Sequence, residues 1–475
     1  MSDLTSFKVL SHAGMQFEYG CSIIFDPWLM GSCYWRSWWN YPPVRPELLA
    51  GLQPDFVVLT HIHWDHFHGP SLRKFDRATP ILIPKDHYPR ISKDLKTLKF
   101  VDVRELPHGR RVRLGDDLYI TSYQFFPFTD SAVVLEAGDV TLLNANDSKF
   151  VGLPLSQILH RHPKIDFLFR SHSSANDRLC YEFIDGGPVA ADDLGRYSES
   201  FCRFVRKVNP RYAIPFASNH CHLHQDVIHF NDSVQTPMKV AEQFAAFKVA
   251  HPEVQTDLQV MVSGDSWSAE HGFQIAQQDY FENREAHLAR YAEEMAPKLE
   301  ETYSKEASAV LNMTLLQNKL KLFSDALPWF VRQRFRSQPV ALVLTAGGRR
   351  EVLSFDVSNG TVKPLEHFDE ATHPLQFQTS LEIFQHALRM RLLSHLTISK
   401  RVRYRVTQKT AGLMGLLGYC FQFYEYELFP LRSLFRWRLV DSYFRRWREV
   451  VLYARLSFDL MRGYKPAELE LRYLD

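Results

Sequence analysis

The stretch that decides the fold of this 475-residue chain is Leu59-Thr60-His61-Ile62-His63-Trp64-Asp65-His66. It places three histidines and one aspartate within six positions, directly after the apolar, β-branched run at residues 56–59. Such a run predicts a buried strand. The four polar residues follow directly on the end of that strand, which would hold their side chains close together. Imidazole and carboxylate groups gathered in this way are typical of a metal site. The alternative interpretation is a histidine-rich surface turn.

Length and composition are those of a globular protein with roughly two to three domains. The hydrophobic content is 45%, and the formal net charge of +2 gives no reason to expect a nucleic-acid partner. The six cysteines show no disulfide framework, which indicates reduced thiols and a cytoplasmic protein. We expect neither a signal peptide nor a transmembrane helix, because no apolar run has the required length and flanks.

The first 270 residues alternate predicted strands with predicted helices. Helical patterns lie at residues 71–77 and 199–208. The strand candidates are residues 7–10, 22–25, 56–59, 81–83, 118–121, 132–136, 140–144, 167–169 and 212–214. Strands interleaved with helices predict an α/β architecture in which helices cover the sheets.

Several further polar residues stand at the ends of these predicted strands. Asp26 precedes a proline, Asp147 lies in a small polar turn, and Asp130 stands just before residues 132–136. The alternative interpretation of Asp147, which we favour less, is a turn or N-cap aspartate. His172 follows another strand, where an ordinary loop histidine is as good an interpretation as a functional one.

The segment Asn219-His220-Cys221-His222-Leu223-His224 offers three more histidines after a strand. Alternate spacing puts all three on one face if the segment is extended. One of them would be enough to complete a metal site, and we favour His220, then His222. The other two histidines would hydrogen-bond to a metal-binding side chain, transfer protons or be exposed to solvent.

The H-x-H-x-D-H motif after a strand resembles that of the metallo-β-lactamase superfamily. The resemblance implies an αββα sandwich with two metal ions, held first by His61 with His63 and second by Asp65 with His66. It implies Asp147 as the group that bridges both ions, and we expect Asp65 and His172 to take part in catalysis.

The superfamily usually has a further histidine ligand ahead of the strand that leads to the bridging aspartate. Residues 125–136 contain no histidine here, and Asp130 occupies about the right place. His108 lies too far upstream and is better explained as a turn residue. A carboxylate in place of imidazole makes the site richer in oxygen, which favours iron or manganese over zinc.

Two short pieces, Ser11-His12-Ala13-Gly14 and Asp26-Pro27-Trp28-Leu29, resemble the branch of lactonase-like and phospholipase-like proteins. In that branch the aspartate lies behind a metal-binding histidine and orients its ring. We therefore expect Asp26, together with His12 and His222, to support the ligands and not to bind the metals.

The order of motifs is most similar to that of the CMP-N-acetylneuraminate hydroxylase family, over roughly residues 5–265. That family carries a Rieske iron-sulfur domain with C-x-H and C-x-x-H ligand pairs. Here Cys221 belongs to both the only C-x-H and the C-x-x-H, so no second pair exists in this sequence. Electrons would have to come from an external donor.

Two reactions fit such a site. A di-iron pair would make the protein an oxygenase or hydroxylase that acts on a small organic or carrier-linked substrate. Zinc or manganese ions would instead support hydrolysis of a phosphodiester, lactone or amide. Asp130 and the order of motifs favour iron and oxygenation; the intact motif argues against a scaffold without metals.

The aromatic loop at residues 33–43 contains Trp35, Trp38 and Trp39. These rings could bind an apolar or stackable substrate beside the metals, or they could simply cover the edge of the core.

The rest of the chain divides into a helical connector at residues 271–336, a small α+β domain at 337–410 and a helical tail at 411–475. The α+β domain distantly resembles a sterol-carrier-like fold. From Lys400 the chain has 15 Lys and Arg against 8 Asp and Glu, a net charge of 15 − 8 = +7. The tail mixes arginines with aromatic residues, so it could contact a membrane surface or pack on the protein with its arginine side chains extended to solvent.

Overall fold

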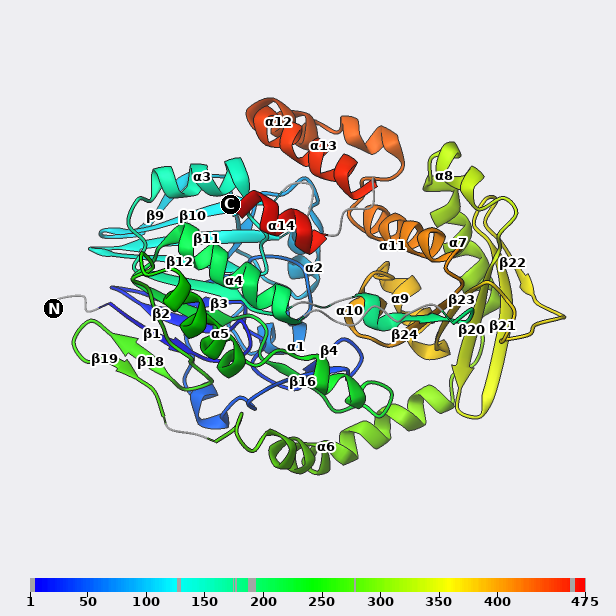
Figure 1. Cartoon of the computed structure of the whole chain (residues 1–475), viewed down its shortest axis with the longest axis horizontal. Helices are drawn as coiled ribbons and strands as arrows, with labels where there is room; N and C mark the ends of the chain where they lie inside the picture. The colour runs from blue at the N-terminus through cyan, green and yellow to red at the C-terminus, as the bar shows by residue number, and fades with distance from the viewer. Residues whose placement is uncertain are drawn as a thin grey trace.

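The computed structural model describes residues 5–125, 130–173, 175, 177–186, 194–276, 279–461 and 466–474. Two large sheets lie face to face, and a third sheet with its own helices lies beside them (Figure 1). The predicted α/β sandwich with a following α+β unit is confirmed.

The first sheet has the strand order β19-β18-β1-β2-β3-β6-β7-β8, in which β3, β6, β7 and β8 run parallel. Its strands are β1 (Ser6–Val9), β2 (Met15–Glu18), β3 (Ser22–Phe25), β6 (Phe56–Val58), β7 (Ile81–Pro84), β8 (Val103–Leu106), β18 (Ser266–Ser268) and β19 (Gly272–Gln274). Strands β6 and β7 are almost wholly buried, as their apolar runs predict.

The second sheet has the order β17-β15-β13-β12-β11-β10-β9, with β9 to β12 antiparallel and the rest parallel. Its strands are β9 (Arg111–Gly115), β10 (Leu118–Gln124), β11 (Ser131–Ala137), β12 (Val140–Asn146), β13 (Phe167–Ser171), β15 (Tyr212–Phe216) and β17 (Asp257–Leu258). Apolar side chains from both sheets, Phe7 and Phe167 among them, form the core between them.

Helices cover the outer faces of this sandwich. The first sheet is covered by α1 (Gly69–Leu72) and α2 (Arg90–Thr97), and the second by α3 (Gly152–Arg161), α4 (Leu194–Val208) and α5 (Pro237–Ala250). The last helix, α14 (Pro466–Leu474), packs on α4 and adds Leu474 to the same core. The C-terminus therefore returns to the sandwich (Figure 1).

The third sheet has the order β14-β24-β23-β20-β21-β22. Its strands are β14 (Tyr181–Phe183), β20 (Val340–Ala346), β21 (Arg349–Asp356), β22 (Thr361–Pro364), β23 (Leu375–Ser380) and β24 (Val402–Val406). Strand β14 comes from the loop after β13 of the sandwich and pairs in parallel with β24. The segment that follows β13 thus supplies an edge strand to the third sheet, and the predicted domain boundaries stay a prediction.

The remaining helices connect and cover these units. They are α6 (Arg284–Ala307), α7 (Met313–Ala326), α8 (Trp329–Arg334), α9 (Leu381–Met390), α10 (His395–Ile398), α11 (Ala411–Glu425), α12 (Trp437–Arg445) and α13 (Trp447–Met461). Short 3-10 helices lie at η1 (Pro46–Leu49), η2 (Asp177–Cys180), η3 (Ile228–Ser233) and η4 (Leu431–Phe435). Helices α7, α9 and α11 share the core of the third sheet. None of the described helices combines the length and apolar character needed to span a bilayer.

A small three-stranded sheet closes one end of the sandwich. It consists of β4 (Ser32–Cys33), β5 (Trp38–Asn40) and β16 (His220–His222), and it brings the aromatic loop against the 220–224 histidines. No sequence pattern predicts this pairing, because the strands have only two or three residues each.

Candidate metal centre

The candidate ligands gather at one edge of the sandwich because they follow strands that end there. The His61–His66 motif follows β6, Asp26 follows the neighbouring β3, and Asp147 follows β12 of the opposite sheet. Asp130 stands just before β11. The two sheets face each other, so these side chains meet across the end of the sandwich.

One group of donors consists of His61, His63 and Asp130, whose ligand atoms all lie within 4.8 Å of one another. The Nε2 atom of His61 lies 4.0 Å from Asp130 Oδ1 and 4.0 Å from Asp147 Oδ2. This Nε2 atom is buried and has no hydrogen-bond partner. An unpaired buried imidazole nitrogen between two carboxylates is what a metal ligand needs.

A second group consists of His66, Asp65, Asp147 and His12. The Nε2 atom of His66 lies 3.2 Å from Asp147 Oδ2 and 3.5 Å from Asp65 Oδ2. His12 Nε2 lies 3.2 Å from the same oxygen of Asp65. The structure thus places His12 among the potential ligands, whereas the sequence predicted a supporting role for it.

Asp26 lies directly behind His66 and is completely buried. Its Oδ2 is 2.8 Å from His66 Nδ1 and accepts a 2.6 Å hydrogen bond from the Thr60 hydroxyl. Its Oδ1 accepts a 2.8 Å bond from the Thr60 backbone amide. The Thr60 hydroxyl also lies 3.0 Å from His61 Nδ1. Asp26 and Thr60 together hold both imidazoles with Nε2 facing the site.

These distances fit metal ions. Two donors that each lie about 2.0–2.2 Å from one ion are about 3–4 Å apart. The carboxylates of Asp65, Asp130 and Asp147 converge on a largely buried space, which costs free energy unless cations neutralise them. The chemistry of the donors and the unpaired His61 nitrogen therefore agree with bound metal.

The electrostatics of the site support the same conclusion. Burial, together with the neighbouring His66 and His63, holds the pKa of His61 well below its usual range, so its ring is neutral. Burial also lowers the pKa of His66, but the carboxylates of Asp65 and Asp26 outweigh it and raise that pKa well above the usual value. Burial raises the pKa of Asp130 to about 6, a cost that a nearby cation would offset.

His220 lies at the rim of this cluster. Its ring is stacked on Trp38 with centroids 3.7 Å apart, and its centroid is 5.8 Å from that of His12. Its Nδ1 lies 3.2 Å from the Ser218 carbonyl oxygen, which leaves Nε2 available as a donor. Its ligand atoms nevertheless do not join any of the compact donor groups of the described residues.

The other two predicted histidines belong to none of the compact donor groups of the described residues, and both ring nitrogens of His172 are buried without a hydrogen-bond partner. His222 Nδ1 lies 3.1 Å from the Ser37 carbonyl oxygen, and its backbone amide donates to Asn231. His172 is buried next to the site, where burial and the neighbouring His12 lower its pKa to about 3. The catalytic role of His172 and the supporting role of His222 stay predictions.

The three tryptophans of the aromatic loop have different surroundings. Trp38 packs behind His220, Trp39 is completely buried with Tyr291 of α6, and Trp35 contacts Trp64 and donates to His386 Nδ1 at 3.0 Å. Only Trp35 is more than slightly exposed. Their role in substrate binding stays a prediction, and burial favours the packing interpretation for Trp39.

Sequence reasoning missed three residues that line the site. The Tyr34 hydroxyl donates a 2.6 Å hydrogen bond to Asp65 Oδ1. His395 of α10 lies with its ring 5.6 Å from that of His63, and the Tyr426 hydroxyl is 3.5 Å from His63 Nε2. The last two come from the C-terminal part of the chain, where no motif marks them.

His395 is completely buried, and neither of its ring nitrogens has a hydrogen-bond partner. Burial and the neighbouring His63 hold its pKa well below the usual range. The helix that carries it belongs to the unit built on the third sheet, so this unit forms one wall of the metal centre.

Comparisons with curated proteins agree with the order of motifs. The chain is 26% identical over 319 residues to a Mycobacterium tuberculosis protein provisionally named a Rieske 2Fe-2S iron-sulfur protein, with 61% of this chain and 60% of the relative covered. It is 28% identical over 146 residues to the Xenopus laevis cytidine monophosphate-N-acetylneuraminic acid hydroxylase, covering 29% of this chain and 25% of the relative. The chain spans at most about 60% of the length of these relatives.

Solved structures are more distant. The diiron β-hydroxylase CmlA from Streptomyces venezuelae matches with a TM-score of 0.37 and 15% identity, over 56% of this chain and 54% of that chain. The metallo-β-lactamase fold protein YhfI from Bacillus subtilis has the same score and identity, over 56% of this chain and all of the other. Likeness at this level gives no information on function.

No protein-family model matches the chain. The chain nevertheless has the predicted αββα arrangement of two facing sheets, and part of its length is similar in sequence to a CMP-N-acetylneuraminate hydroxylase, as the order of motifs predicts.

Proposed function

We propose that this chain binds two metal ions and is a di-iron oxygenase that hydroxylates a small organic or carrier-linked substrate with electrons from an external donor. The observation that carries the proposal is Asp130, a carboxylate grouped with His61 and His63 where a histidine is usual. Oxygen donors favour iron over zinc. The names of two relatives, a hydroxylase and an iron-sulfur protein, both refer to redox chemistry and support the choice.

The proposed ligands are His61, His63 and Asp130 for one ion, and Asp65, His66 and His220 for the other. Asp147 would bridge both, because its Oδ2 faces the Nε2 atoms of His61 and His66 at 4.0 and 3.2 Å. His12 is a further candidate for the second ion. Two irons would supply the activation of dioxygen.

The surrounding side chains would prepare the site for this chemistry. Tyr34 and His12 hold the two oxygens of Asp65, and Asp26 orients His66. His395 and Tyr426 lie against the side of the site next to His63. His395 is buried and neither of its ring nitrogens has a hydrogen-bond partner, so it would present an unpaired nitrogen beside the metals.

A zinc- or manganese-dependent hydrolase is the second candidate. The observation that favours it is the number of imidazoles, since His61, His63, His66 and His220 give a nitrogen-rich set of donors that suits zinc. In that case the metals would lower the pKa of a bound water.

The metal content of protein purified without oxygen separates the two candidates. We expect about two irons per chain by elemental analysis, and consumption of dioxygen when a chemical reductant is supplied. His61→Ala and Asp147→Ala should lose metal while the circular dichroism spectrum stays unchanged. Two zincs per chain with no uptake of dioxygen would reject the oxygenase.

The Asp130→His variant tests the residue on which the choice rests. It restores the usual histidine, so we expect the ratio of bound zinc to iron to rise at least tenfold in a mixture of both metals. Asp139→His, in the turn between β11 and β12, is the matched control. An unchanged ratio in Asp130→His would remove the main support for iron.

A further inference from the structure

Helices α12 and α13 present an unusual surface. The most exposed large apolar side chains of residues 431–461 are Phe435, Trp437, Phe444, Trp447, Val451 and Phe458, which are 54–80% exposed. In α12, Trp437 and Phe444 are seven residues apart, and in α13, Trp447, Val451 and Phe458 follow at four and seven. Each set lies on one side of its helix. We call these six side chains the aromatic ridge.

The charge exposed around the aromatic ridge is mainly positive. The most exposed charged residues within 431–461 are all arginines: Arg432, Arg436, Arg438, Arg445, Arg448 and Arg455. Arg436 pairs with Glu427, and Arg438 pairs with Glu105 at 2.8 Å, so part of this positive charge is neutralised. The carboxylates of Glu449 and Asp459 are buried, and that of Asp441 pairs with Arg445 at 2.8 Å. A second copy of the chain would therefore meet its own positive charge on this face.

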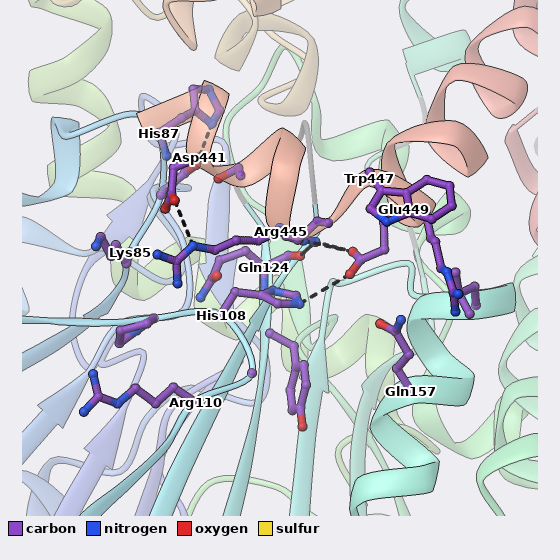
Figure 2. A pocket seen from close by; sticks show the side chains of 18 of the residues that line it. Lys85, His87, His108, Arg110, Gln124, Gln157, Asp441, Arg445, Trp447 and Glu449 are labelled. Carbon is purple, nitrogen blue, oxygen red and sulfur yellow. Dashed lines mark hydrogen bonds and ion pairs between the residues drawn. The ribbon is translucent and has the colours of Figure 1, made fainter. Parts of the chain in front are cut away.

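A groove of about 1010 Å³ lies beneath the ridge, between α12–α13 and the ends of β7 and β8 (Figure 2). Trp437 and Trp447 line it together with Lys85, Arg110 and Arg445. Neither Lys85 nor Arg110 forms an ion pair among the described residues. The groove can thus receive an anionic group between unpaired cations and an aromatic rim.

We propose that α12 and α13 dock this protein on the surface of a bilayer that contains anionic phospholipids. The aromatic ridge would enter the interface between headgroups and acyl chains, and the arginines and the groove would contact the phosphates. Tryptophan and phenylalanine between arginines suit this boundary, where one end of the side chain is apolar and the other is wet. The inference does not depend on which reaction the metal centre performs.

Flotation with vesicles tests the proposal on the full chain. We expect the protein to float with vesicles of phosphatidylcholine and phosphatidylglycerol at low salt, and not with phosphatidylcholine alone. Raising the salt should weaken the binding. A protein that floats with neither kind of vesicle, or equally with both, overturns the proposal.

Two variants separate insertion from simple attraction of charges. Trp437→Ser/Phe444→Ser/Trp447→Ser should lower the bound fraction at least tenfold, and so should Arg448→Glu/Arg455→Glu. The matched controls are Val101→Ser/Val249→Ser, which removes two side chains that are 79% and 85% exposed, and Lys239→Glu/Lys363→Glu. All of these residues are exposed, so each variant should keep its melting temperature.

Each outcome has a definite meaning. Binding that survives the aromatic variant but not the arginine variant overturns docking through the aromatic ridge. An equal loss of vesicle binding in the control variants would mean that binding does not depend specifically on α12 and α13, and it would also overturn the proposal. Lys85→Ala/Arg110→Ala should weaken binding to anionic vesicles. If the protein floats with no vesicle but binds glycerol phosphate, the proposal is overturned and the groove is assigned to a free phosphate ester.

Discussion

Asp26 shows how one buried carboxylate prepares the metal centre. It has a positive φ of 39° at the end of β3, which turns its side chain back toward Thr60 and His66. This conformation is unfavourable for a residue other than glycine, and the hydrogen bonds to Thr60 and His66 compensate for it. Removing the carboxylate would leave the His66 ring without an orienting partner.

We therefore expect Asp26→Ala to lower metal affinity by about 10- to 100-fold while the ligands remain in place. The measurement is titration of the metal-free protein with Fe²⁺ or Zn²⁺. Asp55→Asn is the control. The Asp55 carboxylate accepts a hydrogen bond from the Ser22 backbone amide at the opposite end of the β3–β6 pair, away from the metal centre. Equal affinities in Asp26→Ala and the wild type would contradict the assigned role of Asp26.

Glu425 is a buried acid whose ionisation is coupled to stability. It lies at the end of α11, next to Tyr426, and accepts hydrogen bonds from the Ser394 amide at 2.7 Å and from the Ser394 hydroxyl. Burial raises its pKa to about 7, although Ser394, Arg90 and Arg391 act in the opposite direction. The folded state therefore holds a proton here that the unfolded state releases at lower pH.

A raised carboxyl pKa stabilises the fold below the unfolded value of about 4.3, and this contribution is lost as the pH rises through about 7. We expect the free energy of unfolding to fall by about 3 kcal/mol more in the wild type than in Glu425→Gln between pH 5 and pH 8. Urea denaturation at several pH values measures this difference. Parallel pH profiles for the two proteins would show that Glu425 does not titrate in this range.

At the scale of elements, α14 completes the sandwich through a buried ion pair. Glu470 of α14 pairs with Arg170 of β13, which is 1% exposed and also stacks on Phe204 with its guanidinium 3.8 Å from the ring centroid. Leu474 of the same helix joins the core under α3 and α4. The end of the chain is thus part of the metal domain although it is far from it in sequence.

Glu470→Gln leaves the Arg170 charge buried without a carboxylate, so we expect it to destabilise the fold by about 3 kcal/mol. The double variant Arg170→Met/Glu470→Leu should recover most of that loss, because it removes both charges. Asp325→Asn breaks the exposed pair with Lys321 and should cost less than about 0.5 kcal/mol. Equal losses in the buried and exposed variants, by thermal melting, would refute the role of α14.

At the scale of the whole molecule, the third sheet and its helices complete the site. Figure 1 shows this unit beside the end of the sandwich, with α10 and β24 toward the metal domain. His395 reaches His63, Trp35 reaches His386 of α9, and β14 joins the two units through the sheet. Side chains of both units therefore surround the candidate metal centre.

We expect His395→Phe to keep the full metal content and the melting temperature, because the ring has no hydrogen-bond partner to lose. The rate of dioxygen consumption by the reduced protein should fall at least tenfold, because the variant removes the unpaired ring nitrogens next to His63. Elemental analysis and an oxygen electrode provide the two measurements. Loss of metal in this variant would instead make His395 a ligand.

The sequence alone determined the α/β sandwich, the strand that carries the His61–His66 motif, and the candidates Asp26, Asp130 and Asp147. These follow from local patterns, because apolar runs specify strands and polar residues after them must lie at a sheet edge. The helical connector at residues 271–336 was also predicted, but its division at residues 308–312 into α6 and α7 was not.

Only the tertiary structure decided which of these groups meet. Nothing local brings His12 to Asp65, Tyr34 to the same carboxylate or His395 to His63, because these contacts depend on how whole sheets and units pack. The same holds for β14, which pairs with β24 of the third sheet, and for α14, which packs on the sandwich. Both elements contact parts of the chain that are distant in sequence. The sequence predicted most of the candidate donors, whereas long-range packing added His12 to them and decided the walls of the site, because side-chain type is local and proximity is not.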